Sequence, residues 1–210
     1  MKIDCLTLGD FQTNCYVVRS DEATLDCAII DPGFDPDDLL EFLSQHELTP
    51  VAVIITHGHA DHIAGVAALR QQYPKIKVYI HKLDAGLLTD SQANLSILAG
   101  ATVATEPADV VLKDGDVIEE AGIKLKVLHT PGHTLGGICL YAEPDAVVFA
   151  GDTLFADSVG RTDFPGGDMD QLIESIQTKL FTLPDNTAVH PGHGMRTTIG
   201  REKRANPFVR

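Results

Sequence analysis

The stretch that most constrains this chain is Thr56–His62, which reads THGHADH and directly follows the apolar run VAVII. The run has the length and composition of a strand that is buried on both faces. The next residues bring three histidines and one aspartate together within six positions. Imidazole and carboxylate groups are ligands for zinc and related ions. The stretch therefore predicts a metal site in a loop at the end of a sheet strand, where a rigid scaffold holds ligands open to a substrate.

Three further segments follow the same design, in which an apolar strand ends and a ligand-type residue stands in the next turn. They read VLHTPGHT, VVFAGDT and AVHPGHG. Their glycines and prolines permit sharp turns that direct side chains towards a shared centre. The candidate metal ligands collected in this way are His57, His59, Asp61, His62, His133, Asp152 and His193.

Seven donors are too many for a single ion, because zinc takes four ligands in a structural site and about three from the protein in a catalytic site. His57 and His59 are two positions apart, so in an extended turn they face the same way and can share an ion. His133 completes that set. The pattern predicts a first divalent ion held by three histidines.

A second ion follows from the remaining donors. Asp61 and His62 come about a turn later, where a helix is expected to begin, and they point elsewhere; His193 joins them. Asp152 then bridges the two ions, which in two-metal sites lie about 3.5–4 Å apart. We expect two divalent ions, with zinc favoured and iron or manganese as alternatives.

Hydrophobic patterning predicts strands in two groups, each accompanied by helices. Helices are expected over residues 37–46, 62–72 and 168–180, the last with a capping box formed by Asp168 and Gln171. Two sheets packed face to face with helices outside suit this order better than one parallel sheet. Without linkers or repeats, the chain is expected to form a single domain over residues 1–210.

Composition narrows the partners and the compartment. The net charge of −14 argues against nucleic-acid binding, and no apolar stretch is long enough for a membrane span. The first residues lack the pattern of a signal peptide, and the four cysteines form no C-x-x-C pair. We expect a cytoplasmic protein whose partner is a small-molecule substrate.

The motifs THGHADH, TPGHT, GDTLF and PGHG resemble the signature of the metallo-β-lactamase superfamily. The segments QTNCYVV, DPG, GRTDFPGGD and NPF are similar to its glyoxalase II-like branch. This resemblance implies an αββα sandwich, an α/β architecture of two mixed β-sheets flanked by helices, with the metals at one edge of the sheets. It implies the same division of ligands as the count above.

Glyoxalase II enzymes hydrolyse S-lactoylglutathione, so the resemblance implies a hydrolase of glutathione-type thioesters that acts through a metal-bridging hydroxide. Asp61 and Asp152 are then the catalytic carboxylates. Arg161, Arg196 and Arg201 are candidates for binding an anionic end of the substrate, and Arg161 is the best of them because it lies in the loop after Asp152. The chain departs from the classical enzymes in two ways. It has no long helical region after His193, and the sequence GHGMR contains no tyrosine. It therefore resembles a short form of the family.

Two alternatives remain open. Persulfide dioxygenases share GRTDF and use one iron, for which His57, His133 and Asp152 would form a facial triad. The PGHG segment favours the two-metal hydrolase over this reading. The other alternative is a metal-binding protein without catalytic activity, which a turnover assay distinguishes from an enzyme.

Overall fold

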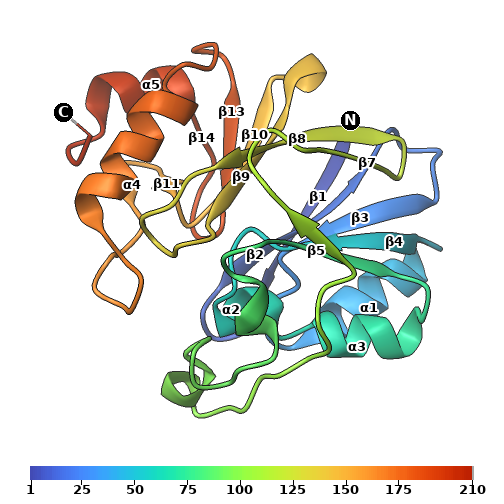
Figure 1. Cartoon of the computed structure of the whole chain (residues 1–210). Helices are drawn as coiled ribbons and strands as arrows, with labels where there is room; N and C mark the ends of the chain where they lie inside the picture. The colour runs from blue at the N-terminus through green and yellow to red at the C-terminus, as the bar shows by residue number, and fades with distance from the viewer. Residues whose placement is uncertain (210) are drawn as a thin grey trace.

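Two six-stranded β-sheets form the centre of the structure, a computed structural model that describes residues 1–209 (Figure 1). The first sheet has the order β1-β2-β3-β4-β5-β6. Its first three strands pair antiparallel and the rest pair parallel, so the sheet is mixed. Its strands are β1 (Lys2–Leu8), β2 (Thr13–Arg19), β3 (Asp26–Ile30), β4 (Thr49–Ile54), β5 (Lys77–His81) and β6 (Val110–Leu112).

The second sheet has the order β14-β13-β10-β9-β8-β7 and is also mixed, because only β10 and β13 pair in parallel among its strands in residues 1–209. A separate two-stranded hairpin, β11 (Leu154–Phe155) with β12 (Ser158–Val159), follows β10. The six strands are β7 (Val117–Glu120), β8 (Ile123–His129), β9 (Ile138–Ala142), β10 (Val147–Gly151), β13 (Ala188–Pro191) and β14 (Thr197–Thr198).

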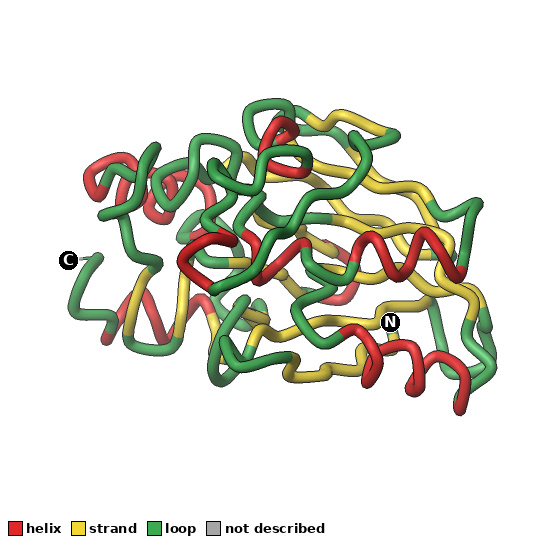
Figure 2. The backbone as a smooth tube through the Cα atoms, turned by 90° about the horizontal axis from the view of Figure 1, so that it is seen from below, coloured by secondary structure: helices red, strands yellow, loops and turns green. Residues whose placement is uncertain are grey.

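Helices cover the outer face of each sheet, and Figure 2 gives the same arrangement from below. The first half of the chain contributes α1 (Pro36–Gln45), α2 (Ala60–Ile63), α3 (Val66–Gln72) and the 3₁₀ turns η1 (Ala85–Leu88) and η2 (Ser96–Ala99). The second half contributes the turn η3 (Glu143–Asp145), α4 (Met169–Ser175), the π-helical turn η4 (Ile176–Leu180) and α5 (Ile199–Ala205).

The buried side chains fall into three layers that correspond to this arrangement. Ile54 and Phe149 belong to the layer between the two sheets. Leu43 of α1 packs in the layer beneath the first sheet, and Leu172 and Ile199 of α4 and α5 pack in the layer against the second. Helix, sheet, sheet and helix therefore follow one another, which confirms the predicted αββα sandwich.

The helix expected over residues 62–72 is interrupted. α2 begins earlier, at Ala60, and Gly65 separates it from α3. The backbone N–H of Gly65 donates to the carbonyl of Pro32 at 2.7 Å, and a Cβ at this position would lie only 2.8 Å from the same oxygen. The break therefore results from a close approach to the turn after β3, which the local sequence does not reveal.

The other expected helices are present. α1 begins at Pro36, and α4 begins after Asp168, whose side chain accepts a hydrogen bond from the N–H of Gln171 at 3.0 Å. The predicted continuation to residue 180 is π-helical. Within residues 1–209, none of the helices combines the length and apolar character needed to cross a bilayer.

Candidate metal centre

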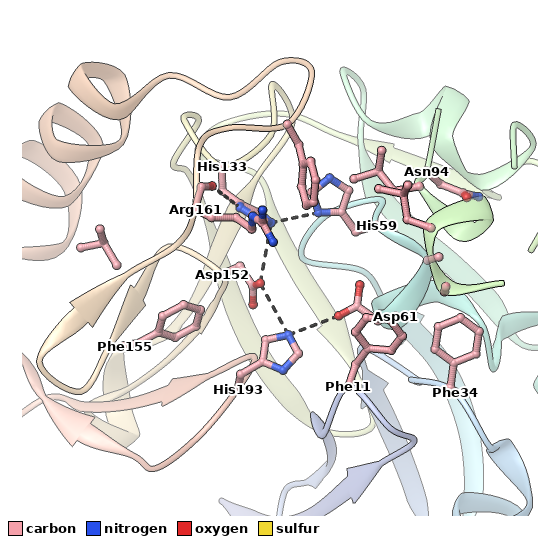
Figure 3. Close-up of a pocket in the computed structure, with 16 residues that line it drawn as sticks. Phe11, Phe34, His59, Asp61, Asn94, His133, Asp152, Phe155, Arg161 and His193 are labelled. Carbon is pink, nitrogen blue, oxygen red and sulfur yellow. Dashed lines mark hydrogen bonds and ion pairs between the residues drawn. The ribbon is translucent and has the colours of Figure 1, made fainter. Parts of the chain in front are cut away.

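The seven candidate ligands follow β4, β8, β10 and β13, five of them in loops and Asp61 and His62 in α2, and they meet at one edge of the sandwich. Figure 3 shows five of them around a pocket, joined by short contacts. Because both sheets end at this edge, segments far apart in the chain supply one cluster. The sequence prediction that these residues lie together agrees with their placement; their role as ligands stays a proposal.

The first donor group consists of His57, His59 and His133, all buried. The Nδ1 atom of His59 lies 2.9 Å from the Nε2 atom of His133. That Nε2 atom lies 3.2 Å from the Nε2 atom of His57. Three ring nitrogens therefore converge on one point.

The second donor group consists of Asp61, His62 and His193. The Nε2 atom of His193 lies 3.2 Å from Oδ2 of Asp61 and 3.3 Å from Nε2 of His62. Both Asp61 and His62 belong to α2, so the start of this helix delivers two donors in consecutive positions.

Asp152 lies between the two groups. Its Oδ2 atom is 3.7 Å from Nε2 of His133 and 3.6 Å from Nε2 of His193. Its Oδ1 atom is 3.5 Å from Nε2 of His62 and is buried without a hydrogen-bond partner in the described part of the chain. A Cβ at Gly192 would collide with this oxygen, so the glycine permits the close approach of the last loop.

These donors fit a pair of cations. Lone pairs of nitrogen and oxygen atoms face one another at distances that need a proton or a cation between them. An orphaned buried carboxylate oxygen has a high desolvation cost, and a metal ion would offset it. The donor set also matches what zinc, iron and manganese accept.

Burial and neighbouring charges set the protonation of the cluster. Burial, reinforced by the adjacent imidazoles, lowers the pKa of His57 well below its usual value and that of His59 to about 3, so both imidazoles are neutral at pH 7. Burial alone would lower the pKa of His62, but the carboxylates of Asp61, Asp31 and Asp152 outweigh it and raise that pKa to about 10. Carboxylates that favour a proton on His62 favour a bound cation in the same place.

Asp31 is the first of the supporting residues that the sequence analysis missed. Its Oδ2 atom lies 2.9 Å from Nδ1 of His62 and accepts the hydroxyl of Thr56 at 2.6 Å, while Oδ1 accepts the N–H of Thr56 at 2.8 Å. The carboxylate thereby fixes the ring of His62 and turns its Nε2 towards the second group. Asp31 follows β3, so the strand-end pattern used for the ligands could have singled it out.

Asp84 connects two ligand loops in a similar way. Its Oδ2 atom accepts the N–H of Gly58 at 3.0 Å and the hydroxyl of Thr134 at 2.8 Å, and Oδ1 accepts the N–H of Gly136 at 2.7 Å. One buried carboxylate thus holds the loop of His57 and His59 against the loop of His133. Nothing in the local sequence around residue 84 indicates this role.

Strand β2 positions the loop of His193. The side-chain amide of Asn14 donates to the carbonyls of Pro191 at 3.0 Å and Gly194 at 2.9 Å. The hydroxyl of Thr13 donates to Oδ2 of Asp61 at 3.4 Å. The segment QTNCYVV, quoted above only for its resemblance to the family, therefore links the first sheet to Asp61 through Thr13 and to the loop of His193 through Asn14.

Arg161 touches the site through its main chain. Its carbonyl lies 2.7 Å from Nδ1 of His133 and fixes the orientation of that ring. Its guanidinium donates two 2.7 Å hydrogen bonds to the carboxylate of Asp163 and lies 4.0 Å from the centre of the Phe164 ring. Binding of a substrate by this side chain stays a prediction, and it would have to compete with Asp163.

Comparison with known proteins identifies the relatives of this architecture. Residues 8–193 match the model of the metallo-β-lactamase superfamily. The chain is 36% identical to the hydroxyacylglutathione hydrolase GloC of Haemophilus influenzae, over 100% of this chain and 98% of GloC. It is also 36% identical to the probable metallo-hydrolase YqgX of Bacillus subtilis, over 100% of this chain and 98% of that one.

Solved structures give the same relationship. BLEG-1, a B3 metallo-β-lactamase, superposes with a TM-score of 0.94 at 40% identity, covering 99% of each chain. TTHA1623 in a di-iron-bound form gives 0.86 at 40% identity, covering 98% of this chain and 99% of the other. ETHE1 from Myxococcus xanthus superposes with a TM-score of 0.81 at 33% identity, covering 99% of this chain and 84% of the other.

Proposed function

The chain belongs to the metallo-β-lactamase superfamily, and from this premise we propose that it is a two-metal hydrolase of thioesters, with glutathione-type thioesters such as S-lactoylglutathione as the substrate class. One observation carries the proposal. Two donor groups of three residues lie on either side of Asp152, which itself forms a third group with His57 and His62 and whose Oδ1 atom is buried without a hydrogen-bond partner in residues 1–209. The 36% identity to GloC supports the choice of thioester.

Each donor group has three protein side chains and access to the pocket. His57, His59 and His133 would hold one ion, and Asp61, His62 and His193 would hold the other, with Asp152 between them. When bound, such ions supply Lewis acidity for a carbonyl and a water whose pKa falls towards about 7.

The chain's own residues orient the reactants. Burial alone would raise the pKa of Asp61, but His62 and His193 lower it well below its usual range, so this carboxylate is ionised at neutral pH. It lines the pocket and can orient the attacking water or accept its proton. Asp31 and Asp84 hold the ligand loops, and the thiolate is a good leaving group that needs little acid assistance.

The test combines metal content with activity. Protein kept away from chelators should contain about two ions per chain by elemental analysis and hydrolyse S-lactoylglutathione. His193→Ala should lower the content to about one ion and remove most of the activity. The matched control is His46→Ala, which removes an exposed histidine outside the site.

A second candidate is a mononuclear iron oxygenase, favoured by the GRTDF segment that persulfide dioxygenases share and by the proximity of His57, His133 and Asp152. It predicts one iron per chain, consumption of oxygen with glutathione persulfide, and an iron content that is unchanged by His193→Ala. That result would overturn the two-metal hydrolase.

A further inference from the structure

Beside the donor groups lies a pocket of about 450 Å³, a size typical of small-molecule sites. Five of the seven donors form its floor. Its walls are mainly apolar and include Phe11, Phe34, Leu95, Leu98, Phe155 and Val159. The pocket therefore places a hydrophobic surface directly next to the reacting groups.

The apolar walls stand on both sides of the donors. Figure 3 shows Phe11 and Phe34 beside Asp61, and Phe155 on the opposite side beside Asp152 and His193. The rings of Phe11 and Phe34 stack with 5.8 Å between their centres. A thioester has its acyl group and its thiol on opposite sides of one carbonyl carbon. Whichever direction the acyl group takes from the donors, it meets an apolar wall.

Polar side chains outside the donor groups are already engaged. The amide nitrogen of Asn94 donates to the carbonyls of Leu87 at 3.0 Å and Val103 at 2.8 Å, and its oxygen accepts the N–H of Ser96 at 3.0 Å. The guanidinium of Arg161 is paired with Asp163. Asn94 and Arg161 are the polar lining residues outside the donor groups within residues 1–209. Outside the donor groups, a hydroxyl on the acyl group thus meets polar side chains on these walls only at Asn94, whose amide is committed elsewhere, and at the exposed guanidinium of Arg161 within residues 1–209.

The wall beside α2 is fixed to the metal site. The carbonyl of Asn94 accepts the N–H of Ala60 at 2.9 Å, where the donor-bearing helix begins. Leu95 follows with φ of +67°, a left-handed conformation that is costly for a leucine.

Leu98 is 70% exposed and Phe11 49% exposed, so large apolar side chains at the mouth of the pocket remain uncovered. Exposed apolar surface at a pocket commonly marks a binding site.

We propose that these walls bind the acyl group of the substrate, and that the site therefore prefers thioesters with an apolar acyl chain or ring to hydroxyacyl thioesters. This inference rests on the proposed function. In the reaction, water adds its oxygen to the acyl carbon and the C–S bond breaks, which gives a carboxylic acid and a thiol; no oxidant or reductant takes part.

The first experiment compares acyl groups on one thiol. Lactoyl, butyryl and phenylacetyl thioesters of glutathione are assayed with the metal-loaded protein. Each buried methylene contributes roughly a fourfold factor in binding, so kcat/KM for the phenylacetyl thioester should exceed that for the lactoyl thioester by about tenfold or more. Equal or lower values for the apolar acyl groups would overturn the inference while leaving the thioesterase intact. Failure to hydrolyse any of the three would instead contradict the proposed function.

A second experiment measures binding without turnover. Thioethers of glutathione that carry a phenethyl or a hydroxyethyl group cannot be hydrolysed, and their affinities are compared by calorimetry. The phenethyl compound should bind about tenfold more tightly, with a negative heat-capacity change from apolar burial. Equal affinities would overturn the inference.

Two neighbouring exposed aliphatic residues provide a matched pair of variants. Leu98→Asn changes a residue of the wall, and Ile97→Asn changes the preceding residue, which is 57% exposed and does not line the pocket. Leu98→Asn should reduce the preference for phenylacetyl over lactoyl by at least threefold, whereas Ile97→Asn should leave the ratio unchanged. An unchanged ratio in Leu98→Asn would remove this wall from acyl recognition.

Discussion

The Nδ1 atom of His62 lies 2.9 Å from the Oδ2 atom of Asp31, and both side chains are buried. When the ring donates its Nδ1–H to this carboxylate, its Nε2 lone pair faces Asp61, Asp152 and His193. Asp31 would therefore act on an ion held by His62 without lining the pocket, through the orientation and basicity of that imidazole.

Asp31→Asn should weaken binding of the second ion by about 10–100-fold, the usual effect of removing such a supporting carboxylate. Binding of the first ion should change less, because Asp31 reaches its histidines only through Thr56, whose hydroxyl lies 3.2 Å from Nδ1 of His57. Competition with a chromophoric chelator measures both affinities. Asp38→Asn removes an exposed carboxylate elsewhere and serves as the control. Unchanged affinity for both ions in Asp31→Asn would contradict the supporting role.

Asp152→Ala removes the donor shared by the two groups, which leaves two cations close together without an intervening carboxylate. We expect loss of the second ion and a fall in kcat of at least about 100-fold, on the scale of changes in the ligand sphere. Metal content and single-substrate kinetics check the two parts separately. A variant that retains two ions and near-normal activity would show that another residue bridges them.

The sequence predicts that the seven candidate ligands lie together, because their signal is local. Three histidines and an aspartate after a buried strand leave few other interpretations, and the later donors repeat the same strand-end context. The αββα order follows likewise from two groups of strands with helices between them. These features depend on residues that are close neighbours in the chain.

The supporting contacts depend on pairing between distant segments, and a single sequence does not reveal the partners, even where a strand-end position such as that of Asp31 marks the residue itself. Asp31 meets His62 across 31 positions, and Asp84 meets Gly136 across 52. The break at Gly65 arises from the carbonyl of Pro32, which approaches only when β3 and the helix are both in place. Local sequence patterns therefore predict the candidate ligands but not the residues that orient them.

Asp84 offers a test of such a distant contact. Asp84→Ala leaves two N–H groups and one hydroxyl without their acceptor in a buried place, at about 1 kcal/mol or more each. We expect the free energy of unfolding of chelator-treated protein to fall by about 3 kcal/mol, measured in urea. Asp90→Ala, which removes an exposed carboxylate that accepts two loop N–H groups, should cost about 1 kcal/mol or less. An equal loss of unfolding free energy in the two variants would mean that the burial of Asp84 adds nothing to the stability that its hydrogen bonds provide.

His81 should make the metal-free protein sensitive to acid. Its side chain is 1% exposed and stacks on His129, and burial with this neighbour lowers its pKa from 6.5 to about 4. Between these values the unfolded chain binds a proton that the folded protein does not, so the free energy of unfolding rises with pH. The contribution is complete above pH 6.5 and is lost as the pH falls towards 4.

His81→Phe keeps a flat ring on His129 but removes the titrating group. Urea unfolding of both proteins at several pH values, in the presence of chelator, isolates this difference because all other groups are shared. Wild-type protein should lose more stability than the variant between pH 7 and about pH 4.5. Parallel curves would show that His81 does not contribute to the acid sensitivity.

Arg161 and Asp163 form an ion pair on which we expect recognition of an anionic carrier to depend. Both side chains are more than half exposed, and an exposed ion pair contributes little to stability, so a substrate carboxylate can displace Asp163. A guanidinium recognises a carboxylate through two parallel hydrogen bonds, and Asp163 occupies the guanidinium in that way. Asp163 therefore competes with any anionic substrate for Arg161.

Asp163→Ala should lower KM for S-lactoylglutathione about two- to fivefold with little change in kcat, because it frees the guanidinium for the carboxylates of glutathione. Arg161→Ala should have the opposite effect and raise KM more than it lowers kcat. The same acyl group on N-acetylcysteamine, a thiol without a carboxylate, provides the control, and neither variant should change its KM. The effects on KM should also be smaller at high salt, since the Arg161–Asp163 ion pair and the ion pair of Arg161 with a substrate carboxylate are both exposed. If both variants show unchanged kinetics on the glutathione thioester, the side chain of Arg161 takes no part in binding, and its contribution to the site is limited to the carbonyl that orients His133.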